Sequence, residues 1–157
     1  MADSAEGTGG GERPIGWFNY GCSYLDAAEH LVRAIEQGQL TLRFDSPVSF
    51  LVGHGLELLI KAYLRSAGMT DAQVERIGHN LQTLLSTAAA RNLDFELTEL
   101  EQGHVALLNR DFGGRPYAVR YLRTGAKQVH DDRVVLAAAR RLEDHIRPGV
   151  LASMRGS

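Results

Sequence analysis

The chain has 157 residues, a length typical of a single domain. Because only 23% of its residues are charged and its formal net charge is −2, it is not a polycation, so any binding of nucleic acid requires a local patch of positive charge. The single cysteine, Cys22, excludes an internal disulfide and a cysteine-based zinc cluster, and no apolar run approaches the roughly 20 residues that span a bilayer.

The first elements along the chain are a tail and a long helix. Residues 1–13 are rich in Gly, Ala and Glu and have no apolar core, which is typical of a disordered tail and not of a signal peptide. Large residues then recur at helical spacing and predict an amphipathic helix that ends at Gly38. The stripe expected to be buried consists of Trp17, Tyr20, Tyr24, Ala28, Leu31 and Ile35.

A second helix forms the most apolar part of the chain. It is expected to begin at Asp45-Ser46-Pro47, where a capping side chain precedes a proline in the first turn, and to end near Ser66, before Gly68. Apolar side chains cover almost its whole circumference, which predicts a helix in the middle of a bundle. Its leucines expected to be buried are Leu51, Leu58 and Leu59.

Capping signals divide the rest of the chain into further helices. Thr70-Asp71-Ala72-Gln73 and Thr98-Glu99-Leu100-Glu101 match the capping box, and Asn80 caps a helix between them. The last helix is expected to begin at Asp131 or Asp132 and to end at Pro148. The stripes expected to be buried are Leu81, Leu84, Leu85 and Ala88, then Leu100, Leu107 and Leu108, and finally Val135, Ala138, Leu142 and Ile146.

Five or six helices with short connections predict an all-α fold, an up-and-down antiparallel helical bundle. We expect one helical domain over residues 14–149, followed by a C-terminal tail at 150–157. The absence of a long apolar run, together with one cysteine, favours a cytoplasmic protein without a membrane segment.

A polar row interrupts the apolar surface of the second helix. His54, Glu57 and Lys61 are spaced by three and four residues and therefore share one face. One interpretation is an exposed Glu57–Lys61 pair, worth about 0.3–0.5 kcal/mol, beside a histidine that only packs. The other is a partly buried polar network, in which we expect Glu57 to contact Lys61 or His79 from the next helix.

The stretch from 112 to 130 contains no acidic residue and interleaves positive charge with aromatic rings. Arginine forks suit phosphate and tyrosine faces suit unstacked bases, so this segment is the candidate RNA or phosphate site. Alternatively, its arginines pair with the acidic stretch at 94–101 and its tyrosines pack on the bundle. The candidate residues are Arg115, Tyr117, Arg120, Tyr121 and Lys127, next to Arg123.

Two segments resemble HEPN-domain proteins. Residues 46–64 (SPVSFLVGHGLELLIKAYL) resemble the central helix of that family, and residues 78–85 (GHNLQTLL) resemble the Gly-His-Asp-Leu-type start of the helix that often follows it. The similarity extends over roughly residues 17–147. It implies a helical bundle, frequently a homodimer, among relatives that include ribonucleases, toxins of toxin–antitoxin and phage-defence systems, and non-catalytic RNA- or nucleotide-binding proteins.

The resemblance also implies where catalysis would take place. Catalytic HEPN proteins carry an arginine that steadies the scissile phosphate and, after four to six further residues, a histidine for acid–base work on the 2′-hydroxyl. Arg123 and His130 have this spacing, and Arg140 and His145 form a weaker second pair. The residues after the two arginines are Thr124 and Arg141, where the family prefers Asn, Asp or His.

These departures favour a HEPN-like module that binds RNA or a nucleotide without catalysis, in a toxin–antitoxin or phage-defence setting. A metal-independent endoribonuclease that uses an Arg–His pair is the first alternative. A homodimeric protein-interaction module, with an antitoxin or another protein as its partner, is the second. No metal-ligand spacing or phosphate loop is present in the sequence, so no metal or other cofactor is expected.

Overall fold

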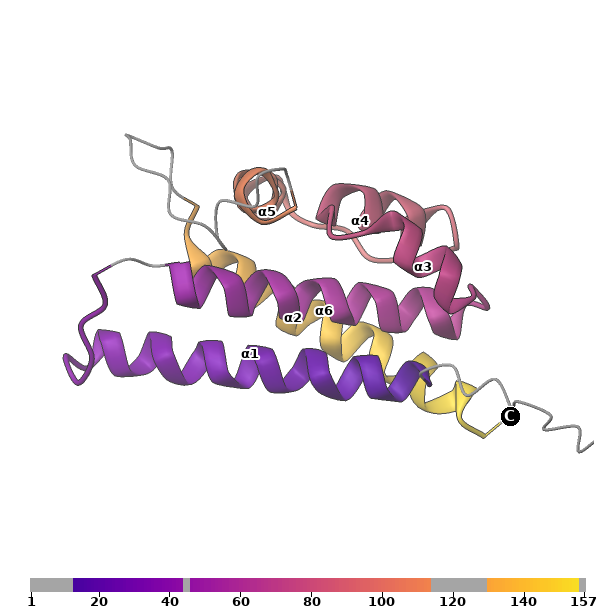
Figure 1. Ribbon diagram of the computed structural model, residues 1–157, viewed down its shortest axis with the longest axis horizontal. Helices are drawn as coiled ribbons and strands as arrows, with labels where there is room; N and C mark the ends of the chain where they lie inside the picture. The colour runs from indigo at the N-terminus through magenta and orange to yellow at the C-terminus, as the bar shows by residue number, and fades with distance from the viewer. Residues whose placement is uncertain (1–12, 44–45, 114–129, 156–157) are drawn as a thin grey trace, which may run out of the picture.

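The computed structural model describes residues 13–43, 46–113 and 130–155. Within these residues the chain forms six α-helices and no strand (Figure 1). This confirms the all-α fold. None of the described helices is long and apolar enough to cross a membrane. The helices are α1 (Pro14–Glu36), α2 (Ser46–Ser66), α3 (Asp71–Ile77), α4 (Leu81–Ala89), α5 (Glu99–Phe112) and α6 (Asp132–Ser153).

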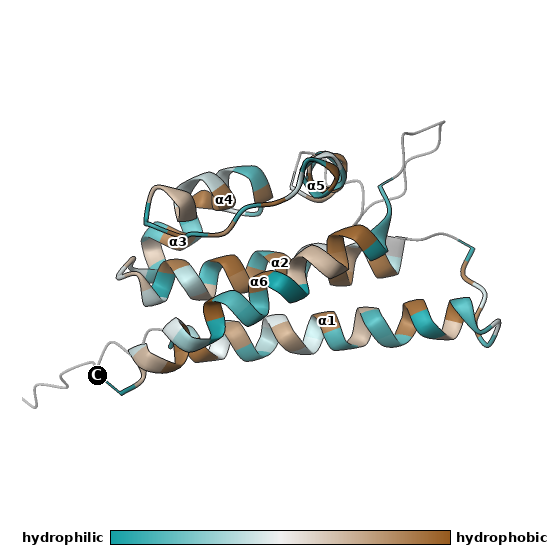
Figure 2. Cartoon of the chain, turned by 180° about the vertical axis from the view of Figure 1, so that it is seen from behind, coloured by the Kyte–Doolittle hydropathy of each residue, from teal (hydrophilic) through white to brown (hydrophobic). Residues whose placement is uncertain are grey.

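Helix α2 lies in the middle of the described structure, as its all-round apolar surface predicts, and it contacts each of the other helices. Helices α1 and α2 run side by side, α6 packs against both of them, and α3, α4 and α5 cover another side of α2 (Figure 1). Helix α5 is seen end-on in this view, so it crosses α2 instead of running along it. Hydrophobic residues line much of α2, whereas hydrophilic residues alternate with them on α1 and α6 (Figure 2).

The face that α1 turns toward α2 differs from the predicted stripe. The buried residues are Phe18, Gly21, Leu25 and Ala28, whereas Tyr20 is 63% exposed and Ile35 is also exposed. A Cβ atom at Gly21 would lie 3.1 Å from the carbonyl oxygen of Gly55, and one at Gly55 would lie 2.6 Å from a methyl group of Leu25. Two glycines therefore bring the helices close together. Of the predicted stripe, Ala28 is buried, and Trp17 and Leu31 are partly buried against the core.

The helix starts agree with the capping signals in the sequence. The Thr70 hydroxyl accepts a hydrogen bond from the Gln73 amide while the Gln73 side chain accepts one from the Thr70 amide, and Thr98 and Glu101 repeat this box. Asn80 caps α4 and Asp131 caps α6 through their side-chain oxygens. These caps fix where α3 to α6 begin, because each satisfies amides that have no partner within the helix.

Helix α6 does not end at Pro148 as predicted but continues to Ser153. Pro148 lies on the exposed side, where the Asp144 carbonyl that loses its amide partner can be solvated. Two residues further, Val150 is fully buried in the core. Burial of this turn favours continuation of the helix over the local preference of proline.

The predicted core is correct for α6 and partly wrong elsewhere. Leu58, Leu59, Leu84 and Leu142 are buried, but Leu51 and Leu85 are only half-buried. In α5, Leu108 is buried, Leu107 is half-buried and Leu100 is 62% exposed. The residues of α5 that are buried in the core, Val105, Leu108 and Phe112, follow a different helical stripe from the one expected.

Candidate functional site

The polar row of α2 forms a buried cluster around Glu57. This side chain is 1% exposed, and its Oε1 atom lies 2.5 Å from Lys61 Nζ and 2.9 Å from His79 Nδ1. His54 Nδ1 lies 3.5 Å from Oε2, the other carboxylate oxygen. The expected contacts with Lys61 and His79 are both present, so the interpretation as an exposed surface pair is wrong.

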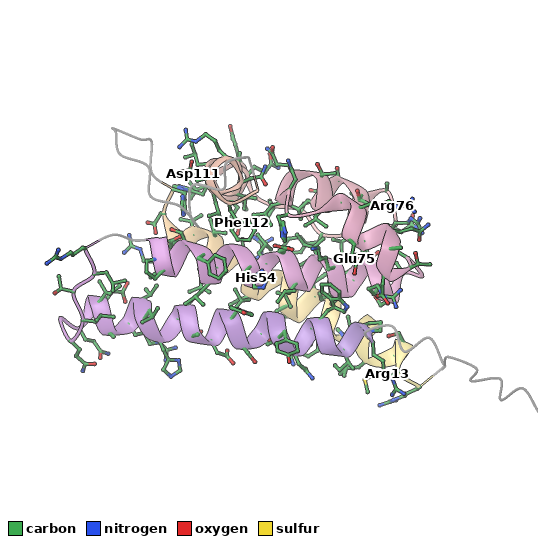
Figure 3. The ribbon with its side chains drawn as sticks, viewed as in Figure 1. Arg13, His54, Glu75, Arg76, Asp111 and Phe112 are labelled. Carbon is green, nitrogen blue, oxygen red and sulfur yellow. The ribbon has the colours of Figure 1, made fainter. Side chains whose placement is uncertain are left out.

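Aromatic rings pack against the His54 side of this cluster. The His54 ring meets Tyr24 edge-on at 4.6 Å between centroids and stacks on Phe50 at 5.6 Å (Figure 3). Burial alone would raise the pKa of Glu57, but His54 and the charges on Lys61 and His79 outweigh it and lower the pKa from 4.5 to about 2. Glu57 is therefore a charged group that joins α2 to the start of α4.

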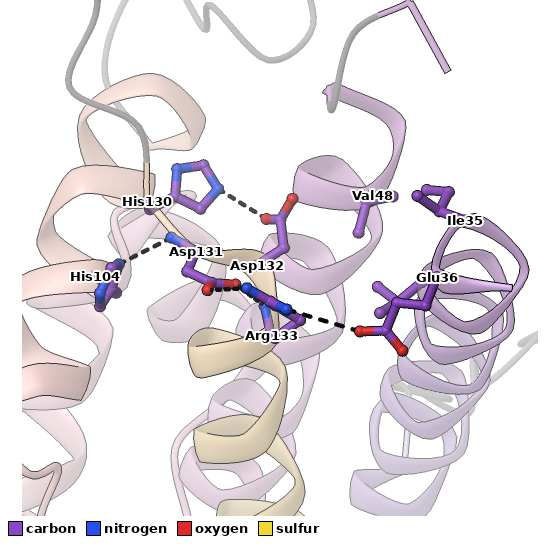
Figure 4. A pocket seen from close by; sticks show the side chains of 9 residues that line it. Ile35, Glu36, Val48, His104, His130, Asp131, Asp132 and Arg133 are labelled. Atoms are coloured by element: carbon purple, nitrogen blue, oxygen red, sulfur yellow. Dashed lines mark hydrogen bonds and ion pairs between the residues drawn. The ribbon is translucent and has the colours of Figure 1, made fainter. Parts of the chain in front are cut away.

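A second polar group surrounds the start of α6, where a pocket of about 390 Å³ opens between α1, α2, α5 and α6 (Figure 4). Its apolar wall is made by Val32 and Ile35 of α1 and Val48 of α2. Its polar lining comprises Glu36, His104, His130, Asp131, Asp132 and Arg133. The volume lies within the range of about 300–1,000 Å³ that is usual for small-molecule sites.

The side chain of His130, one of the predicted catalytic residues, is held from one side of its ring. Its Nε2 atom lies 2.8 Å from Asp132 Oδ1 and 3.1 Å from Ser49 Oγ, while the Ser49 hydroxyl donates to Asp132 Oδ2. Because the carboxylate can only accept, Nε2 is the donor in the contact with Asp132. In a Ser–His–Asp catalytic triad the acid and the serine contact opposite ring nitrogens, so this arrangement does not activate Ser49.

The other polar groups of the pocket are tied to the first turn of α6. The Asp131 amide donates to His104 Nδ1 at 2.9 Å, which joins α5 to α6. The guanidinium of Arg133 donates to both carboxylate oxygens of Asp131, and these bonds lower the pKa of Asp131 to about 2. The side chains that line the pocket thus include three carboxylates and one guanidinium.

The second predicted pair, Arg140 and His145, is not brought together. The Arg140 guanidinium donates to Asp26 and Glu29 of α1 and to Glu143, which fixes α6 against α1. The His145 ring lies 5.7 Å from the Phe95 ring, in the link between α4 and α5. Arg140 contacts α1 and its own helix, whereas His145 contacts the link between α4 and α5. These contacts point to structural roles for both residues.

Several predicted site residues lie outside the described residues. These are Arg115, Tyr117, Arg120, Tyr121, Arg123 and Lys127. His130 is the first described residue that follows this segment in the chain. The position of the basic segment in the sequence therefore connects it to the pocket, while its own contacts stay a prediction.

Sequence reasoning did not single out Ser49, His104 or Glu36 as parts of a site. Ser49 lies within an apolar helix, and 81 residues separate it from His130. Asp131 and Asp132, which follow the catalytic candidate His130, are interpreted in the sequence only as helix caps. Three neighbouring polar residues at a helix start were the one local signal available.

No family model, curated protein or solved structure matches this chain. Within the described residues, no group of three or more His, Cys, Asp and Glu side chains is arranged to hold a metal ion.

Proposed function

We propose that this chain is a HEPN-like module that binds RNA without cleaving it. The observation that carries the proposal is the pocket at the start of α6, because its lining residues 130–133 directly follow the basic, aromatic segment in the chain. Charge on that segment suits the phosphates of single-stranded RNA, and the pocket has the size of a ligand site. The resemblance at residues 46–85 adds the family context, including the toxin–antitoxin or phage-defence setting.

The polar lining of the pocket argues against cleavage there. A scissile phosphate at His130 would lie near Asp131, Asp132 and Glu36, with Arg133 already bonded to Asp131. Like charges repel a phosphate at these short distances, and catalysis of phosphoryl chemistry depends on compensating that charge. The same environment does not oppose the binding of a neutral base.

A metal-independent endoribonuclease is the second candidate, favoured by one detail of His130. Its Nε2 is anchored by Asp132 and Ser49, and a carboxylate partner of this kind orients a histidine whose other nitrogen acts as a base. Arg123 would have to supply the missing positive charge.

RNA binding is tested by the salt dependence of affinity. Replacing Arg115, Arg120, Arg123 and Lys127 with alanine is expected to flatten the slope of log affinity against log salt by up to about 3 units, since each phosphate contact with a single strand contributes about 0.7. Fluorescence anisotropy with a labelled single-stranded RNA measures the slope. A matched control replaces the exposed Arg13, Arg43, Arg76 and Arg91 with alanine. Equal slopes for both variants would contradict the proposal.

Cleavage is tested in the same preparation. Pure protein incubated with mixed cellular RNA is expected to leave it intact, as are the His130→Ala and His145→Ala variants. Cleavage by the wild type that His130→Ala abolishes would establish the endoribonuclease instead. Cleavage that survives both substitutions would point to a contaminating nuclease, and further purification would remove it.

The homodimer stays a proposal, supported by the resemblance and by large exposed apolar side chains on α1, of which Tyr20 is the most exposed. Light scattering at micromolar concentration is expected to give twice the chain mass. Tyr20→Glu should shift the mass toward the monomer if this face is the interface, because the dimer would bury the new charge. A monomer mass for the wild type would contradict the proposal and leave a different protein partner as the alternative.

A further inference from the structure

The pocket at the start of α6 contains a donor and an acceptor that are not saturated. Glu36 and Arg133 face each other at 3.8 Å, from Oε1 to Nη1, which is beyond hydrogen-bond distance. Their side chains are 53% and 65% exposed. Since the Nε and Nη2 atoms of Arg133 are bonded to Asp131, Nη1 is the part of the guanidinium left for another acceptor.

An apolar wall adjoins this pair. Val32, Ile35 and Val48 line the same pocket, and Ile35 and Glu36 are consecutive at the end of α1 (Figure 4). Aliphatic side chains of this kind pack on the face of a nucleobase that has left its stack. The pocket thus offers an apolar contact together with a carboxylate and a guanidinium N–H.

We propose that this pocket takes one unstacked guanine base of the bound RNA, an inference that rests on the proposed function. The Watson–Crick edge of guanine presents two adjacent N–H donors, at N1 and N2, beside the acceptor O6. A carboxylate accepts from both donors, and a guanidinium N–H donates to O6. Adenine, cytosine and uracil lack two adjacent ring and amino donors, so they match Glu36 and Arg133 less well.

The charge of the pocket agrees with this assignment. Glu36, Asp131 and Asp132 disfavour a phosphate, but carboxylates are natural acceptors for the amino groups of bases. Under the proposed function, contacts with the RNA backbone elsewhere on the chain supply affinity, and the pocket supplies selectivity.

The test compares RNA pentamers that differ only at the central base. Oligomers UUGUU and UUIUU, where I is inosine, differ by the 2-amino group that Glu36 is proposed to bind. The wild type is expected to bind the guanine oligomer about tenfold more tightly in a fluorescence anisotropy titration. In Glu36→Gln the ratio should fall toward one, because the amide replaces one acceptor oxygen by a donor. Glu75→Gln, an equally conservative change at an exposed site on α3, should keep the wild-type ratio.

Equal affinity of the wild type for the two oligomers, or a preference that survives Glu36→Gln, overturns the guanine site while leaving RNA binding intact. If neither oligomer binds, the proposed function fails, and the pocket is then decided with free guanosine and inosine. Shifts of the Ile35 and Val48 methyl signals in NMR spectra that are larger with guanosine support the site. An absence of shifts with guanosine overturns it.

Discussion

Replacing Glu57 with glutamine is expected to lower the free energy of unfolding by about 3–5 kcal/mol, the usual cost of removing one partner from a buried ion pair. Lys61 is 6% exposed on its side chain and would keep a charge without its carboxylate. Denaturant titration measures the loss. Glu75→Gln on exposed α3 is the matched control and should change stability by less than about 0.5 kcal/mol.

Two further measurements separate a buried pair from general damage to the helix. Adding Lys61→Met to Glu57→Gln should restore part of the stability, because the second change removes the unpaired charge. The pKa of Glu57 is lowered in the folded state, so its stabilisation is complete above the ordinary value of 4.5 and is lost as the pH falls toward about 2. The difference between wild type and Glu57→Gln should therefore narrow over that interval. A constant difference would mean that folding does not lower the pKa of Glu57.

Phe112→Ala is expected to destabilise the protein by about 3–5 kcal/mol, because it empties a fully buried site. The ring lies at the end of α5 against Gly53 of α2, where an added Cβ would be 2.8 Å from Phe112 Cδ2 (Figure 3). Gly53→Ala alone should cost about 1–3 kcal/mol through overpacking. Denaturant unfolding of both single variants gives these values.

The combination of the two changes gives the sharper result. In the Phe112→Ala background, the methyl group at position 53 enters the space that the ring has left, so the double variant should be less destabilised than the sum of the single variants. A coupling of about 0.5–3 kcal/mol is expected for residues in contact. Additive effects would show that the ring does not occupy the space above Gly53.

The features that sequence could predict are those with local causes. The capping boxes at Thr70 and Thr98 involve residues three positions apart, so the sequence contains the whole interaction. The Glu57 cluster was predictable for a similar reason, because three of its members share one face of α2 and the fourth, His79, was suggested by the HEPN resemblance. The Pro148 prediction failed because the burial of Val150, two residues later, outweighed the local preference of proline.

The packing face of α1 and the pocket depend on distant parts of the chain. Large residues defined the predicted stripe, but the contact is decided by how closely Gly21 and Gly55 let two helices approach. The pocket joins residues from α1, α2, α5 and α6, and no spacing within one helix indicates that Glu36 and Arg133 will meet. The packing face of α1 and the pocket therefore become visible only in the tertiary structure.

The position of α6 has a consequence for the newly made chain. Helix α6 packs against α1 and α2, which are both synthesised before it. Until α6 has left the ribosome, the apolar surfaces that it covers have no partner from this chain. A nascent chain that stops after α5 should therefore expose the apolar surface of α1 and α2 that α6 covers, and ribosomes stalled before α6 should retain more chaperone than ribosomes stalled after it.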